Sequence, residues 1–171
     1  PKGAAFRSRQ VATLSGLAHE QFTDAGFGQN IKALLNSNGD LEPGQRRNLE
    51  RSLEDYEKAT CLDKAFVVRR SEAVSRGYHA WLKARKENDF SIFQDPLSEL
   101  VEIKKEEAEQ LGYEAHPYDA LLDQFEPGYT SSQLDALFKD VREQLVDFVR
   151  RIREKPQVDD QFLHQPYDTD V

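Results

Sequence analysis

The chain has 171 residues, of which 38% are hydrophobic and 32% charged, and its formal net charge is −8 at pH 7. An acidic chain repels phosphate backbones, so we expect no general binding to nucleic acid. No apolar run approaches the roughly 18 residues of a membrane span and no secretory signal is present, so a cytoplasmic protein without membrane association is the default expectation.

The first half of the chain shows apolar residues at helical spacing. Stripes over residues 14–22 and 31–35 predict two helices that end before Asn38-Gly39. Pro43 opens a third helix, because proline tolerates the first helical position, where its missing N–H would have no partner. A long fourth helix is predicted to begin after Asp63 and to end near residues 88–89.

The second half begins with a strong start signal at Asp95-Pro96, in which aspartate supplies the capping oxygen. This helix is predicted to run to Gly112, which stops it. A short helical turn follows Pro117.

The best-defined helix is predicted from Thr130, which forms a capping box with Gln133, to Lys155, with Pro156 ending it. The stripe of this helix contains eight large apolar residues, Leu134, Leu137, Phe138, Val141, Leu145, Phe148, Val149 and Ile152. No alternating strand pattern occurs anywhere in the chain. The sequence therefore predicts an all-α fold, with a helical region over residues 1–156 and an extended connection over residues 157–171.

The histidines and the cysteine give little support for a metal site. The chain contains four histidines that are dispersed along the sequence, His19, His79, His116 and His164. His19-Glu20 begins like the H-E-x-x-H zinc helix, in which two imidazoles one turn apart hold the metal and the glutamate serves as base. The fifth position is Thr23, so the second ligand is missing. Cys61 is the single cysteine, so we expect no metal bound by these residues.

Adjacent carboxylates occur at several places, including Glu54-Asp55, Glu106-Glu107 and Asp159-Asp160. Neighbouring residues on a helix do not face one another, so such pairs are weak candidates for acid–base catalysis. The sequence predicts that they form solvated surface.

The segment from His116 to Gly128, HPYDALLDQFEPG, has an unusual composition. Its prolines enclose histidine, tyrosine, two aspartates and a glutamate. One interpretation is a capped turn whose Leu121, Leu122 and Phe125 enter the core. The other is a functional surface on a loop.

The same segment resembles a signature stretch of the carboxypeptidase Taq family, also called thermostable carboxypeptidase 1. The similarity continues on both sides, through ATLSGLAHEQFTD, NLERSLEDYEKAT and HAWLKARKENDFSIFQDPLSELVEIKKEEAEQLGY before it and TSSQLDALFKDVREQLVDFVRRI and FLHQPYD after it. Nearly the whole chain is covered in order.

The resemblance implies a helical zinc peptidase that removes residues from peptide C-termini with broad specificity, with cobalt able to replace zinc and the parent protein a homodimer. The zinc helix and the other active-site motifs of the family lie beyond the region matched here. The resemblance therefore implies that this chain is inactive by itself and carries no catalytic residue or metal ligand.

What the resemblance implies for these residues is architecture. The helices should form one wall and lid of the substrate groove of a gluzincin-type peptidase, completed by the remainder of the protein. The candidates for lining this groove are His116, Tyr118, Asp119 and Asp123. An apolar surface should then remain exposed where the remainder would pack. The alternative is a stand-alone helical interaction domain without catalysis, which predicts a closed core.

Overall fold

The computed structural model describes residues 3–37, 39, 41–156 and 158–166. Within these ranges the chain forms α-helices and one short 3-10 helix and no β-strand, which confirms the all-α prediction. In chain order the elements are α1 (Ala4–Phe22), α2 (Ala25–Asn36), α3 (Pro43–Thr60), α4 (Lys64–Glu87), α5 (Ser91–Leu111), α6 (Pro117–Leu122), α7 (Ser131–Arg153) and η1 (Gln161–His164). None of the described helices is long and apolar enough to cross a membrane.

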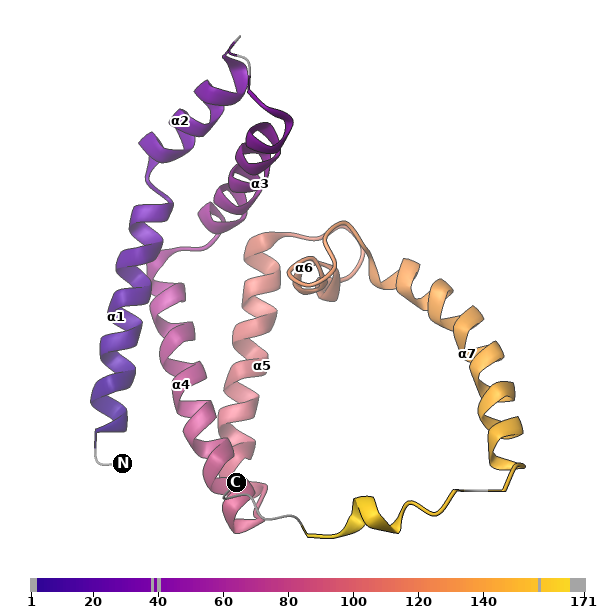
Figure 1. The fold of residues 1–171 in the computed structure, drawn as a ribbon. Helices are drawn as coiled ribbons and strands as arrows, with labels where there is room; N and C mark the ends of the chain where they lie inside the picture. The colour runs from indigo at the N-terminus through magenta and orange to yellow at the C-terminus, as the bar shows by residue number, and fades with distance from the viewer. Residues whose placement is uncertain (1–2, 38, 40, 157, 167–171) are drawn as a thin grey trace.

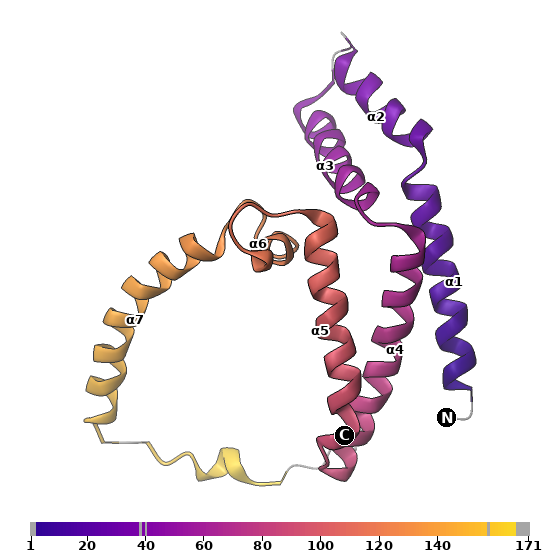
Figure 2. The same ribbon diagram turned by 180° about the vertical axis from the view of Figure 1, so that it is seen from behind.

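Three long helices, α1, α4 and α5, lie side by side with α4 in the middle (Figure 1). The α2–α3 hairpin extends from one end of this layer, and α6 lies at the end of α5. Helix α7 arches away from the layer in both views (Figure 2), and of the helices it contacts mainly α6. The packed part of the fold is therefore the α1–α4–α5 layer.

The buried core is small and lies between α4 and α5. It contains Phe66, Val67, Ala73 and Ile103, with Leu62 and Leu100 packed against it. Close packing on both sides of α4 depends on two glycines. A Cβ at Gly16 would lie 2.7 Å from Val68 Cγ2, and one at Gly77 would lie 2.8 Å from Leu100 Cδ1.

Several helix ends match the signals read from the sequence. The Asp63 side chain accepts a hydrogen bond from the Phe66 N–H at 2.6 Å and caps α4. At the start of α7 the Thr130 N–H donates to Gln133 Oε1 at 2.9 Å, and the capping box is complete. Gly112 ends α5 with φ of 80°, the left-handed region that glycine reaches without strain.

The start of α5 differs from the prediction. The helix begins at Ser91 and not at Asp95, and Pro96 lies inside it. Asn88, with φ of 51°, ends α4, and Asp89 Oδ1 accepts hydrogen bonds from the Ser91 N–H at 2.9 Å and the Ser91 hydroxyl at 2.7 Å at the start of α5. Pro96 is the sixth residue of the helix, and its missing N–H removes one hydrogen bond from the second turn.

The end of the described chain contains a turn of helix. After α7 ends at Arg153, residues 161–164 form η1. The predicted extended connection over residues 157–171 is thus interrupted by this turn, and positions 157 and 167–171 lie outside the described residues.

Candidate functional site

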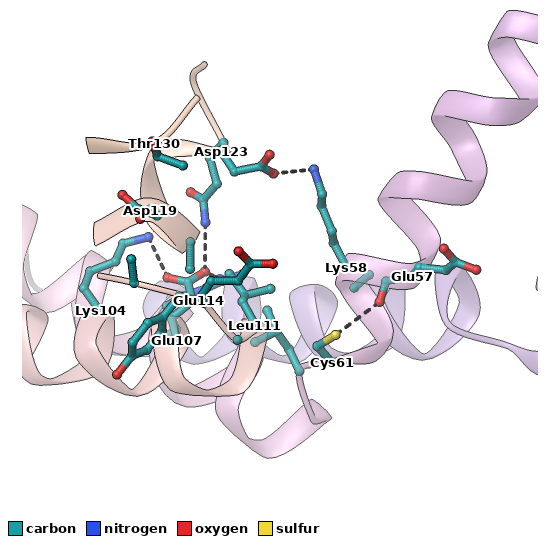
Figure 3. Close-up of a pocket in the computed structure, with 18 of the residues that line it drawn as sticks. Glu57, Lys58, Cys61, Lys104, Glu107, Leu111, Glu114, Asp119, Asp123 and Thr130 are labelled. Atoms are coloured by element: carbon teal, nitrogen blue, oxygen red, sulfur yellow. Dashed lines mark hydrogen bonds and ion pairs between the residues drawn. The ribbon is translucent and has the colours of Figure 1, made fainter. Parts of the chain in front are cut away.

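A cavity of about 860 Å³ lies where the end of α3, the end of α5, α6 and the start of α7 meet (Figure 3). Its lining includes apolar side chains from all but the last of these elements, among them Ala59, Leu62, Leu111 and Ala120. Charged and polar side chains line the remaining wall of the cavity. Concave sites with apolar walls and a few fixed polar groups are the usual form of a ligand-binding pocket.

Glu107 lies in the wall of this cavity and is only 1% exposed. Lys104 Nζ donates to Glu107 Oε2 at 2.6 Å, and Arg70 donates to Glu107 Oε1. Gln124 Nε2 also reaches Oε1, at 3.5 Å. The carboxylate is thus paired on both oxygens, as a buried charge must be, and it joins α4, α5 and the turn after α6.

Asp123 joins the opposite sides of the cavity. Its carboxylate pairs with the Lys58 ammonium from α3, and it also accepts a hydrogen bond from the Gly128 N–H at 3.3 Å (Figure 3). The hydrogen bond from Lys58 is the main cause that lowers the pKa of Asp123.

Asp119 fixes the start of α7. Its Oδ1 accepts a hydrogen bond from the Ser131 N–H at 2.7 Å, at the first residue of that helix. This backbone hydrogen bond is the largest cause that lowers the pKa of Asp119. A carboxylate at a helix N-terminus is stabilised by the helix dipole as well.

The structure brings two of the four predicted groove residues to the cavity. Asp119 and Asp123 line it, whereas His116 and Tyr118 are absent from its lining. His116 Nδ1 accepts a hydrogen bond from the Tyr118 N–H at 3.1 Å and caps α6. The Tyr118 side chain is 55% exposed. Neither His116 nor Tyr118 lines this cavity, so a role for them in a groove stays a prediction.

The interpretation of residues 116–128 as a capped turn is right about the cap and wrong about one apolar residue. Leu122 is buried, with 7% of its surface exposed, but Phe125 is 80% exposed and does not enter the core. Helix α6 ends at Leu122, so helical spacing no longer sets the direction of Phe125. The Phe125 N–H still donates to the Leu122 carbonyl at 2.9 Å, within a tight turn.

Sequence reasoning missed the residues that organise the cavity. The prediction that Glu106-Glu107 is solvated surface is wrong for Glu107, which is buried. The partners Arg70 and Lys58 are 37 and 65 residues away from Glu107 and Asp123, respectively. Such distant pairs leave no local pattern in the sequence. The one available signal was Lys104 three residues before Glu107, which is the spacing of an ion pair on one helix face.

The donor set does not fit a catalytic metal ion. Among the described residues no group of three or more His, Cys, Asp or Glu side chains is placed to hold a metal. His19, the start of the incomplete zinc motif, instead has Nε2 at 2.9 Å from the Leu62 carbonyl oxygen. We therefore assign no chemical step of this chain to a metal.

Comparison with known proteins gives the family. The model of the family described as carboxypeptidase Taq (M32) metallopeptidase matches residues 1–171. The chain belongs to this family.

Individual members of the M32 family agree with this assignment. Thermostable carboxypeptidase 1 of Pyrococcus furiosus is 33% identical over 160 residues, covering 92% of this chain and 31% of the relative. The solved structure of CHT is 40% identical with a TM-score of 0.77, covering 99% of this chain and 34% of that one. The crystal structure of BsuCP has 31% sequence identity and a TM-score of 0.83, and the match covers 90% of this chain and 31% of the BsuCP chain. The chain thus spans about a third of the length of the curated M32 relatives that it matches.

Proposed function

We propose that this chain is the N-terminal helical part of a zinc-dependent metallocarboxypeptidase, which hydrolyses C-terminal residues from peptides with broad specificity. The observation that carries the proposal is the match of the M32 family model to all 171 residues. The relatives named carboxypeptidase support the reaction class. The parent protein, meaning the longer protein that would contain this chain, is proposed to be a cytoplasmic homodimer. Its single cysteine in this region suits a reducing compartment.

The metal centre is assigned to the part of the parent protein outside this chain, because the described residues offer no donor set for it. A zinc ion held there would supply a Lewis acid for the scissile carbonyl and for the attacking water, and cobalt would be expected to replace it. With the metal centre outside it, the chain has a structural role in substrate binding and no role in the proton transfers of peptide hydrolysis.

The role that we assign to the chain is one wall and lid of the peptide groove. The cavity between α3, α5 and α6 supports this, because it has apolar walls and fixed charges. Asp119 and Asp123 belong to the wall, and the buried Glu107 network keeps the wall rigid. The same residues are held by hydrogen bonds within the chain, so they position the wall and do not react.

Hydrolysis of matched peptides tests the proposal. One peptide has a free C-terminal carboxylate, and its control has the same sequence with an amidated C-terminus. The parent protein should release the C-terminal residue of the first alone, and a zinc chelator should stop the release. The 171-residue chain should release nothing from either peptide. Chelator-sensitive cleavage by this chain, or an inactive parent protein in zinc and in cobalt, would reject the proposal.

A stand-alone interaction domain remains the second candidate. The apolar side chains exposed along α7 count against it, because a self-sufficient domain predicts a closed core. If the chain acts alone, it should remain a monomer with a single cooperative melting transition until a partner is added, and sedimentation with calorimetry would show this.

A further inference from the structure

Helix α7 is the least packed long element of the fold. None of its 23 residues is buried. Six of its large apolar side chains lie along one side of the helix and are between 38% and 59% exposed. We call this set the α7 apolar face, and it consists of Leu137, Phe138, Val141, Leu145, Phe148 and Val149.

The α7 apolar face has the pattern of a surface made for packing. Its residues recur three and four positions apart, which gathers them on one side of a helix, while Glu143 falls on the opposite side. Exposed apolar faces of this extent are rare on monomeric proteins and mark interaction surfaces. Most helical stability in proteins comes from packing such a face and not from propensity.

Contacts within the described chain do not cover this face. Helix α7 contacts α6, and its N-terminus is held by Thr130 and by the Asp119 carboxylate. Beyond this end, both views show α7 lying apart from α4 and α5 (Figures 1 and 2). Within the described residues, the main contact of α7 with another helix is therefore the one with α6, at its N-terminal end.

The lengths of the relatives indicate what covers the face. The arrangement of these helices matches BsuCP with a TM-score of 0.83, in a chain of which this sequence covers 31%. The same helices thus adopt a similar arrangement in a longer chain. The polypeptide outside the matched region of that chain is about twice as long as the matched region. Resting on the proposed function, we infer that the α7 apolar face is the docking surface for the part of the parent protein outside this chain.

The size of α7 suits this interface. A helix of 23 residues is about 34 Å long. Stable interfaces bury about 1,200 to 2,000 Å² in total and have an apolar centre with a polar rim. The apolar face supplies that centre, and the charged residues beside it, such as Arg142 on one side and Arg151 on the other, supply the rim.

Hydrogen exchange of residues 131–153 tests the inference in two proteins, the 171-residue chain and the parent protein. We expect the amides of α7 to exchange at least about 100-fold more slowly in the parent protein, because docking makes helix opening unfavourable. In the parent protein, Leu145→Asp should remove this protection by placing a charge in the interface. Glu143→Asp is the matched control, since it introduces the same residue two positions away on the opposite side and should keep the protection.

The milder Leu145→Ala variant covers the case in which Leu145→Asp fails to fold, and it should give intermediate protection. Equal exchange of α7 in the two proteins would overturn the inference. Protection that appears in the 171-residue chain alone and rises with its concentration would also overturn it, since a second copy would then cover the face. If α7 is protected in a parent protein that does not hydrolyse peptides, the proposed function fails and the docking surface stands.

Discussion

Glu107 receives hydrogen bonds from three side chains that belong to different parts of the chain. Arg70 comes from α4, Lys104 from α5 and Gln124 from the turn after α6. A buried carboxylate with two cationic partners is costly to disturb, because removing its charge leaves the cations without a partner. This residue therefore connects the packed layer to the candidate cavity.

We predict that Glu107→Gln lowers the free energy of unfolding by about 2 kcal/mol. The amide keeps the shape of the side chain but loses the charge that pairs with Arg70 and Lys104. The control is Glu102→Gln, whose exposed pair with Lys105 should contribute less than about 1 kcal/mol. Urea denaturation measures both, and equal effects would contradict the role of Glu107.

The two aspartates of the cavity predict a dependence of stability on pH. The pKa of Asp123 is lowered mainly by its hydrogen bond from Lys58, and that of Asp119 mainly by the Ser131 N–H. A lowered pKa contributes stability that is complete above the unfolded-state value, near 3.8, and is lost as pH falls through the folded-state value. The melting temperature should therefore fall as the pH drops below about 4. The Asp123→Asn variant should show a smaller fall over the same range, and an unchanged fall would contradict the Lys58 pair.

Within the α2–α3 hairpin, the packing depends on the absence of a side chain at Gly28. A Cβ there would lie 2.4 Å from the ring of Tyr56, which itself contacts Phe22 and Phe27 with centroids 6.5 and 6.1 Å away. This aromatic group joins the hairpin to the end of α1. Close approach at Gly28 is thus what fixes the direction of the hairpin.

Alanine at two glycines of the hairpin should have opposite effects. Gly28→Ala should destabilise the chain by about 1 to 3 kcal/mol, because the ring of Tyr56 must move. Gly44→Ala, with nothing within 4 Å of its Cβ, should stabilise it by about 0.5 kcal/mol. Thermal melting of the two variants gives the sign of each effect. A stabilising Gly28→Ala would show that the hairpin is not packed as described.

The first residue of a helix was predictable where a single local signal marks the start of that helix. Asp63 and Thr130 each place a capping oxygen beside an apolar stripe, and both helices begin where the sequence predicts. Asp95-Pro96 gives an equally strong signal, but α5 begins at Ser91, five residues before Pro96, where the Ser91 N–H donates to Asp89 Oδ1. Two aspartates in one stretch offer capping oxygens, and the local signal alone does not distinguish them.

The candidate site was less predictable than the helices for a related reason. The composition of residues 116–128 indicated the location, and Asp119 and Asp123 do line the cavity. Their partners, Ser131 and Lys58, follow from the three-dimensional approach of α3, α6 and α7. Periodicity in one helix carries no information on which other helix it meets, so the buried position of Glu107 was not visible either.

The whole molecule consists of a packed helical layer and one long helix that extends from it. The α1–α4–α5 layer holds the core, while α7 extends from it with its apolar face exposed. The chain covers about a third of its curated M32 relatives. The proposed function divides the parent protein accordingly, with the groove wall in this chain and the metal centre in the remaining polypeptide.

Zinc retained after dialysis tests this division most directly. We predict about one zinc per parent protein and none retained by the 171-residue chain, because the four histidines of the chain are dispersed and none of the described acidic, histidine or cysteine side chains form a metal-binding group. Elemental analysis of both proteins from the same buffer gives the two numbers. Stoichiometric zinc held by the 171-residue chain and lost when two of its histidines are replaced would contradict the account.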